Sequence, residues 1–141
     1  MPNQETPYFL DTNILVYAYD HKYPDKMERA RDLIAAEKPW LISWQAVQEF
    51  CNVAIHKFTI PLDTAYLSEL LDILLIPHCQ IYPNASVWQN ALRIQSETQY
   101  RFYDSQIVAA ALHSKASILF SEDLQHGRRF GDLQILNPFL E

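Results

Sequence analysis

Short apolar runs alternate with longer amphipathic segments along the whole chain. Runs bounded by Pro, Gly or polar residues predict strands at 8–10, 40–43, 79–82, 118–120 and 134–136. Apolar residues at helical spacing predict a short helix after residue 13 and longer ones over about 24–38, 44–58, 63–76, 84–98 and 103–115. Strands separated by helices need crossover connections. We therefore expect a three-layer α/β/α fold around a mainly parallel sheet of about five strands.

Composition supports one compact domain over residues 1–141. Hydrophobic residues make up 49% of the chain, and the chain contains only two glycines. This composition is typical of a globular protein and argues against disorder. The net charge of −6 gives no reason to expect diffuse attraction to nucleic acid. Neither a signal segment nor an apolar run of about eighteen residues is apparent, so we expect a cytoplasmic protein without a membrane span.

The segment between Asp63 and Pro77 is apolar on nearly all sides. A helix of this kind is either fully buried or used for association. We keep both interpretations, the second of which predicts a homodimer.

Three aspartates occupy positions where an acid can have a role beyond solubility. Asp11 follows the first strand and Asp123 lies just beyond the strand at 118–120, so the two share one edge if these strands are parallel neighbours. Asp104 opens a helix and shares its apolar face. The alternatives are N-capping for Asp11 and Asp104, and a solvated loop position for Asp123. Glu49 falls on the polar side of its helix, so periodicity alone places it in solvent.

Four motifs, in this order, resemble the PIN domain family, most closely the VapC-type toxins of toxin–antitoxin pairs. They are Phe9-Leu10-Asp11-Thr12-Asn13-Ile14-Leu15, Ser43-Trp44-Gln45-Ala46-Val47-Gln48-Glu49-Phe50, Tyr103-Asp104-Ser105-Gln106-Ile107-Val108-Ala109-Ala110-Ala111 and Ser121-Glu122-Asp123-Leu124-Gln125. The resemblance covers essentially the whole chain and implies a PIN-like fold.

The resemblance also implies a site and an activity. Its metal-binding acids match Asp11, Glu49, Asp104 and Asp123, which the resemblance makes both ligands and catalytic residues. The residues that support these acids match Thr12, Asn13, Ser121 and Glu122. Oxygen ligands suit Mg²⁺ or Mn²⁺. The implied activity is endonucleolytic hydrolysis of RNA to 5′-phosphate and 3′-hydroxyl products, with a cognate antitoxin as partner. Many relatives carry a further acid where this chain has Gln125, and Glu122 is a possible substitute.

Basic residues near the motifs are candidates for RNA contact: Arg101, Arg128 and Arg129. An ordinary solvated loop is the alternative for the last two. Other functions stay open. A PIN scaffold that binds RNA or a protein without cleavage is one. An aspartyl-phosphate phosphatase would need an acid where Asn13 stands, and a receiver-type signalling domain would need a Lys after a late strand, whereas Lys115 comes before one.

Overall fold

The computed structural model describes residues 6–140 and contains a six-stranded sheet with strand order β3-β2-β1-β4-β6-β5. Every neighbouring pair is parallel except β5 and β6. The strands are β1 (Tyr8–Leu10), β2 (Trp40–Ser43), β3 (Cys79–Ile81), β4 (Ile118–Phe120), β5 (Arg129–Phe130) and β6 (Leu133–Leu136). The predicted mainly parallel sheet is confirmed.

The expected number of about five strands is too low by one. The sixth strand, β5, lies in the segment that the sequence marks as a polar loop. Gly127 and Gly131 adopt positive φ angles of 85° and 59°, which glycine reaches without steric cost. These turns fold Arg129 and Phe130 back onto β6 as an antiparallel edge. Two residues are too short a run for a hydrophobic pattern to reveal.

The helices follow the predicted order with slightly different ends. They are α1 (Thr12–Tyr19), α2 (Pro24–Ala35), α3 (Trp44–His56), α4 (Thr64–Leu70), α5 (Ile76–His78), α6 (Ala85–Thr98) and α7 (Phe102–His113). Side chains of Asp11, Ser43, Asp63 and Asn84 cap four of them by accepting backbone N–H groups. The π-helical segment η1 (Leu71–Leu75) joins α4 to α5, which continues past Pro77. We expected the helix to end before Pro77, but it continues through this proline to His78.

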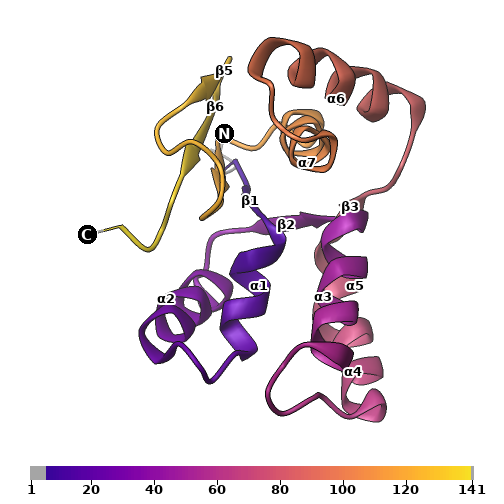
Figure 1. Cartoon of the computed structure of the whole chain (residues 1–141), viewed down its shortest axis with the longest axis vertical. Helices are drawn as coiled ribbons and strands as arrows, with labels where there is room; N and C mark the ends of the chain where they lie inside the picture. Colours follow the sequence, from indigo (N-terminus) through magenta and orange to yellow (C-terminus); the bar gives the residue numbers. More distant parts are fainter. Residues whose placement is uncertain (1–5, 141) are drawn as a thin grey trace, which may run out of the picture.

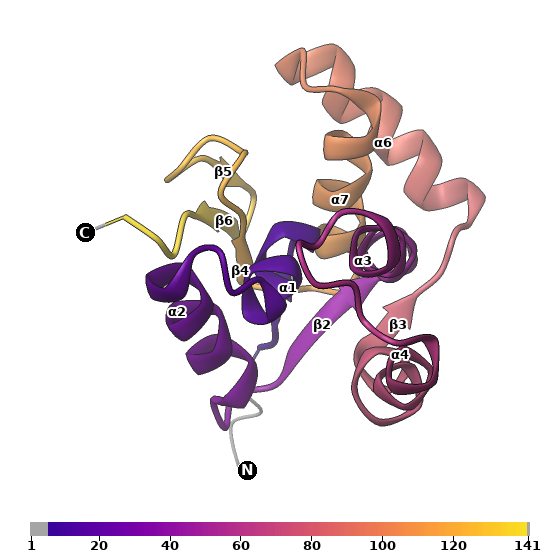
Figure 2. The same cartoon turned by 60° about the horizontal axis from the view of Figure 1, so that its bottom comes forward.

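The sheet separates two layers of helices (Figure 1). Alternate residues of each strand face opposite sides. Leu10, Ile42 and Phe120 pack with α1, α2, α3 and α4 in one apolar cluster. Phe9, Leu119 and Ile135 pack with α6 and α7 in the other. The turned view in Figure 2 shows α6 and α7 together on one side of the sheet. The predicted three layers are confirmed.

The segment from α4 to α5 keeps large apolar side chains on the surface. Ile73 is 74% exposed, and Tyr66 and Ile76 are about half exposed, whereas Leu67 and Leu75 belong to the core. The segment is thus only partly buried within one chain. Across residues 6–140, no helix combines the length and apolar character needed to span a bilayer.

Candidate acidic site

The carboxyl ends of three neighbouring parallel strands meet at one edge of the sheet. Asp11 follows β1, Ser43 ends β2 and Ser121 follows β4. Leu10 pairs with Phe120, and the Asp11 N–H donates to the Phe120 carbonyl at 3.0 Å. The strands before Asp11 and Asp123 are parallel neighbours, which is the condition under which the two acids share one edge. This edge is where ligands bind in open α/β sheets.

Asp11 is buried at this edge with both carboxylate oxygens hydrogen-bonded. Oδ1 accepts the Thr12 backbone N–H at 2.7 Å, and Oδ2 accepts the Ser121 hydroxyl at 2.8 Å. The pKa of Asp11 is raised to about 6, mainly by burial and also by the charges of Glu49 and Asp104, although the two hydrogen bonds lower it. Asp11 therefore caps α1, as the N-capping alternative predicts. Its negative charge is also unfavourable in this buried position.

Glu49 faces the same site from the second turn of α3. Its Oε1 accepts Gln45 Nε2 at 2.7 Å, and the same nitrogen lies 3.4 Å from the Tyr103 carbonyl of α7. Gln45 is buried, and its Oε1 has no partner in the described part of the chain. Gln45 thus links α3 to α7 and directs the exposed Glu49 side chain. Sequence reasoning assigned Gln45 no role, although its position four residues before Glu49 was a signal.

Asp104 and Asp123 complete the acidic group. Asp104 lies in the first turn of α7, where Arg101 is the N-cap residue and no side chain caps the helix, so Asp104 is not the N-cap. Burial is the main cause that raises the pKa of Asp104, and the charge of Asp123 raises it as well. The charge of Arg101 lowers it. Asp123 is exposed, and its Oδ2 accepts the Asn13 amide at 3.1 Å.

These side chains line one open pocket of about 390 Å³. It is lined by Asp11, Thr12, Asn13, Val16, Tyr17, Asp20, Tyr23, Gln45, Glu49, Tyr103, Asp104, Ile107, Glu122 and Asp123. We call it the acidic pocket. The structure thus brings the four predicted acids to one pocket, together with Thr12, Asn13 and Glu122, while Ser121 contacts Asp11 from beneath it.

The acidic pocket suits a hydrated cation better than a tightly enclosed one. Within residues 6–140, no three His, Cys, Asp or Glu side chains are gathered closely enough to enclose a metal ion. None of the four acids forms an ion pair with a described basic residue. Three buried acceptors in the pocket lining lack donors there: Thr12 Oγ1, Asn13 Oδ1 and Gln45 Oε1. Mg²⁺ retains several waters and needs only one or two carboxylates, so this oxygen-only lining fits it.

Glu122 differs from the other acids of the acidic pocket. Its Oε1 accepts the Tyr17 hydroxyl and its Oε2 accepts Lys26 Nζ, both at 2.5 Å. Lys26 also lies over the Tyr17 ring, 4.7 Å from its centroid. We call these three residues the Lys26 cluster. Glu122 lies about a hundred positions from the other two residues, and the sequence contains no signal for this pairing.

The predicted RNA-contacting arginines lie in different surroundings. Arg128 donates to Gln125 Oε1 at 3.1 Å and stacks over the Tyr100 and Phe130 rings. Arg129 donates to Gln134 at 3.3 Å. None of the three arginines lines the acidic pocket, but the charge of Arg101 lowers the pKa of Asp104.

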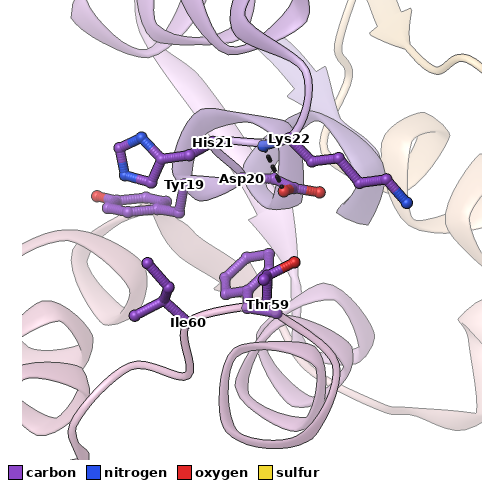
Figure 3. Close-up of a pocket in the computed structure, with 7 residues that line it drawn as sticks. Tyr19, Asp20, His21, Lys22, Thr59 and Ile60 are labelled. Atoms are coloured by element: carbon purple, nitrogen blue, oxygen red, sulfur yellow. Dashed lines mark hydrogen bonds between the residues drawn. The ribbon is translucent and has the colours of Figure 1, made fainter.

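A second, mostly apolar pocket of about 330 Å³ lies beyond the carboxyl end of α1 (Figure 3). Tyr19, Phe58 and Ile60 form its apolar lining, and Asp20 lines both pockets. The Asp20 carboxylate accepts the Lys22 backbone N–H at 3.0 Å, the bond drawn in Figure 3.

Fold and site together define an α/β/α protein with four acids at the carboxyl edge of a parallel sheet. A family profile for the PIN domain matches residues 8–130. The chain therefore belongs to the PIN domain family, which confirms the resemblance. No curated protein sequence matches this chain significantly.

Solved structures that share the fold include a toxin–antitoxin complex and a toxin. A toxin–antitoxin complex from Klebsiella pneumoniae has a TM-score of 0.68 at 16% identity, covering 94% of this chain and 98% of that chain. FitAcB from Neisseria gonorrhoeae has a TM-score of 0.67 at 18% identity, with 94% and 98% covered. VapC20 from Mycobacterium tuberculosis, a sarcin-ricin loop cleaving toxin, has a TM-score of 0.63 at 16% identity, with 82% and 91% covered. At such identities the likeness establishes the fold.

Proposed function

We propose that this chain is a Mg²⁺- or Mn²⁺-dependent endoribonuclease and the toxin of a toxin–antitoxin pair. The observation that carries the proposal is the gathering of Asp11, Glu49, Asp104 and Asp123 around one open pocket in a PIN-domain chain. The products would be a 5′-phosphate and a 3′-hydroxyl. The toxin–antitoxin complex that shares the fold supports an antitoxin as protein partner.

The chain's own residues prepare the pocket for a cation and a phosphodiester. Ser121 and the Thr12 N–H hold the Asp11 carboxylate in one orientation, while Gln45 directs Glu49 and Asn13 directs Asp123. When bound, the ion would supply a Lewis acid that lowers the pKa of a water and stabilises the leaving oxygen. The uncompensated acids favour binding of a divalent cation over direct binding of a phosphate.

The test is cleavage of RNA by purified protein with Mg²⁺ or Mn²⁺ and with EDTA. We expect Asp11→Asn to lower the rate at least about 100-fold, which is what loss of one charge-stabilising group costs an active site. Asp32→Asn is the matched control, because Asp32 is exposed on α2 and does not line the acidic pocket. Cleavage that survives EDTA or Asp11→Asn would contradict the proposal.

One observation favours a second function, a PIN scaffold that binds RNA or a partner without cleavage. Glu122 is bound by Lys26 and Tyr17, and Gln125 contacts Arg128, so neither position offers a free fifth acid to the pocket. A scaffold would bind RNA with the same affinity in wild type and Asp11→Asn, and neither would cut it. Metal-dependent cleavage by wild type alone would exclude it.

A further inference from the structure

Tyr103 is unusually exposed for an aromatic residue beside a candidate active site. Its side chain is 67% exposed, yet it lines the acidic pocket and directly precedes Asp104. Among residues 6–140, its one aromatic neighbour is Phe102, in an edge contact with centroids 5.9 Å apart. A ring with a single edge contact retains free face area on which another planar group can stack.

The backbone that carries this ring is held in place. The Tyr103 carbonyl lies 3.4 Å from Gln45 Nε2, and the residue belongs to the first turn of α7. The next turn of α7 is anchored in the core by Ile107 and Val108. The ring therefore projects from a fixed support rather than from a loose loop.

A cation accompanies the ring. Arg101 is exposed and is the N-cap residue of α7, two residues before Tyr103. Within residues 6–140, its guanidinium forms no hydrogen bond or ion pair. Lys26, by contrast, is bound to Glu122. Arg101 thus supplies an exposed cation on the same short segment as the exposed ring, and cations together with exposed rings bind single-stranded nucleic acid.

We propose that Tyr103 and Arg101 form a nucleotide subsite beside the cut, where an unpaired base stacks on the Tyr103 ring and Arg101 contacts its phosphate. The proposal rests on the proposed ribonuclease function. A base inside a duplex has both faces covered by neighbouring pairs, so only a base outside the helical stack can occupy the ring. The subsite therefore selects unpaired nucleotides next to the scissile bond.

The position of the ring favours RNA over a partner protein as its occupant. A group stacked on Tyr103 lies at the pocket that also contains Asp104 and Glu49, within the span of one bound strand. The pocket itself is negative, so attraction for a polyanion has to come from a bound cation, from Arg101 and from stacking.

The test compares Tyr103→Ala, Tyr103→Phe and Arg101→Gln on a single-stranded RNA that wild type cleaves with Mg²⁺. We expect Tyr103→Ala to raise KM at least about fivefold, the lower end of what one stacked base contributes, with kcat within about twofold. Tyr103→Phe keeps the ring and should retain the wild-type KM. Arg101→Gln should reduce the slope of log KM against log salt by about 0.7, as for one phosphate contact on a single strand.

Tyr66→Ala is the matched control, since Tyr66 is 47% exposed on α4 and outside the acidic pocket. Direct binding of an RNA containing 2-aminopurine beside the cut separates this proposal from the nuclease proposal. Fluorescence quenching on binding to wild type and Tyr103→Phe, but not to Tyr103→Ala, supports the subsite even if no cleavage occurs. Equal KM and equal quenching for Tyr103→Ala and wild type would overturn it and leave the ring as a surface for a protein partner.

Discussion

Two carboxylates of the acidic pocket, Asp11 and Glu122, have opposite surroundings. Asp11 is buried and forms no ion pair with a described basic residue, and its pKa is raised to about 6. Glu122 is partly exposed and bound by Lys26 and Tyr17. The first arrangement costs stability at neutral pH and leaves the charge available to a ligand. The second neutralises the charge within the fold. Asp11 thus keeps a charge that a cation could bind, whereas Glu122 connects the loop after β4 to Tyr17 of α1 and Lys26 of α2.

The largest expected effect is the pH dependence of the metal-free fold. The folded pKa of Asp11, about 6, exceeds its ordinary value of 3.8, so the folded state binds this proton more tightly than the unfolded state. The contribution of Asp11 to the free energy of unfolding therefore rises as pH falls from about 6 toward 3.8, by about 3 kcal/mol in total.

Asp11→Asn removes this titration and can retain both hydrogen bonds, because its oxygen accepts the Thr12 N–H and its amide donates to the Ser121 hydroxyl. We expect the variant to be more stable than wild type at pH 7 in EDTA and to lose that advantage near pH 4. Denaturant unfolding across this range measures the difference. A constant difference between the two proteins would show that Asp11 has an ordinary pKa.

The next effect is stabilisation by a divalent cation. A ligand that binds only the folded state at 100 times its Kd adds about 2.7 kcal/mol to the free energy of unfolding. That corresponds to a rise in Tm of roughly 5–10 °C for a domain of this size. We expect such a rise for wild type with Mn²⁺ or Mg²⁺ and little for Asp11→Asn. The same Tm with and without cation would contradict the assignment of the acids.

Much of the fold follows from local sequence, while the character of the site does so only in part. The five longer strands and the order of the helices are visible because apolar periodicity and capping residues such as Asn84 act over a few neighbouring positions. The closeness of Asp11 and Asp123 follows once their strands are parallel neighbours. Glu49 shows the limit of periodicity, because a polar helix face looks the same whether it meets bulk solvent or a pocket.

Contacts between distant segments account for what the sequence does not reveal. Lys26 and Glu122 lie 96 positions apart, and no local pattern connects them. The donor-less acceptors Thr12 Oγ1 and Gln45 Oε1 become visible only when their surroundings are known. The motif match therefore selects the candidate acids, but not which of them the fold neutralises.

Gln45 offers a smaller test on the side of the uncompensated acids. Gln45→Leu fills similar space but removes the donor that directs Glu49. A hydrogen bond to a charged group contributes about 1.5 kcal/mol or more, so we expect kcat for RNA cleavage to fall about tenfold. Glu49→Gln in the Gln45→Leu background should lose less activity than it does in wild type. Additive losses would show that Gln45 acts independently of Glu49.

The smallest effect belongs to the Lys26 cluster. Glu122→Gln and Lys26→Met each break the ion pair. Because the Lys26 and Glu122 side chains are 35% and 22% exposed, solvent screening limits the coupling to about 1 kcal/mol. A double-mutant cycle on the free energy of unfolding measures this coupling. We expect RNA cleavage by Glu122→Gln to stay within about threefold of wild type, because its charge is already neutralised. A loss as large as that of Asp11→Asn would mean that Glu122 leaves Lys26 to bind the cation, and the contrast between the two carboxylates would no longer hold.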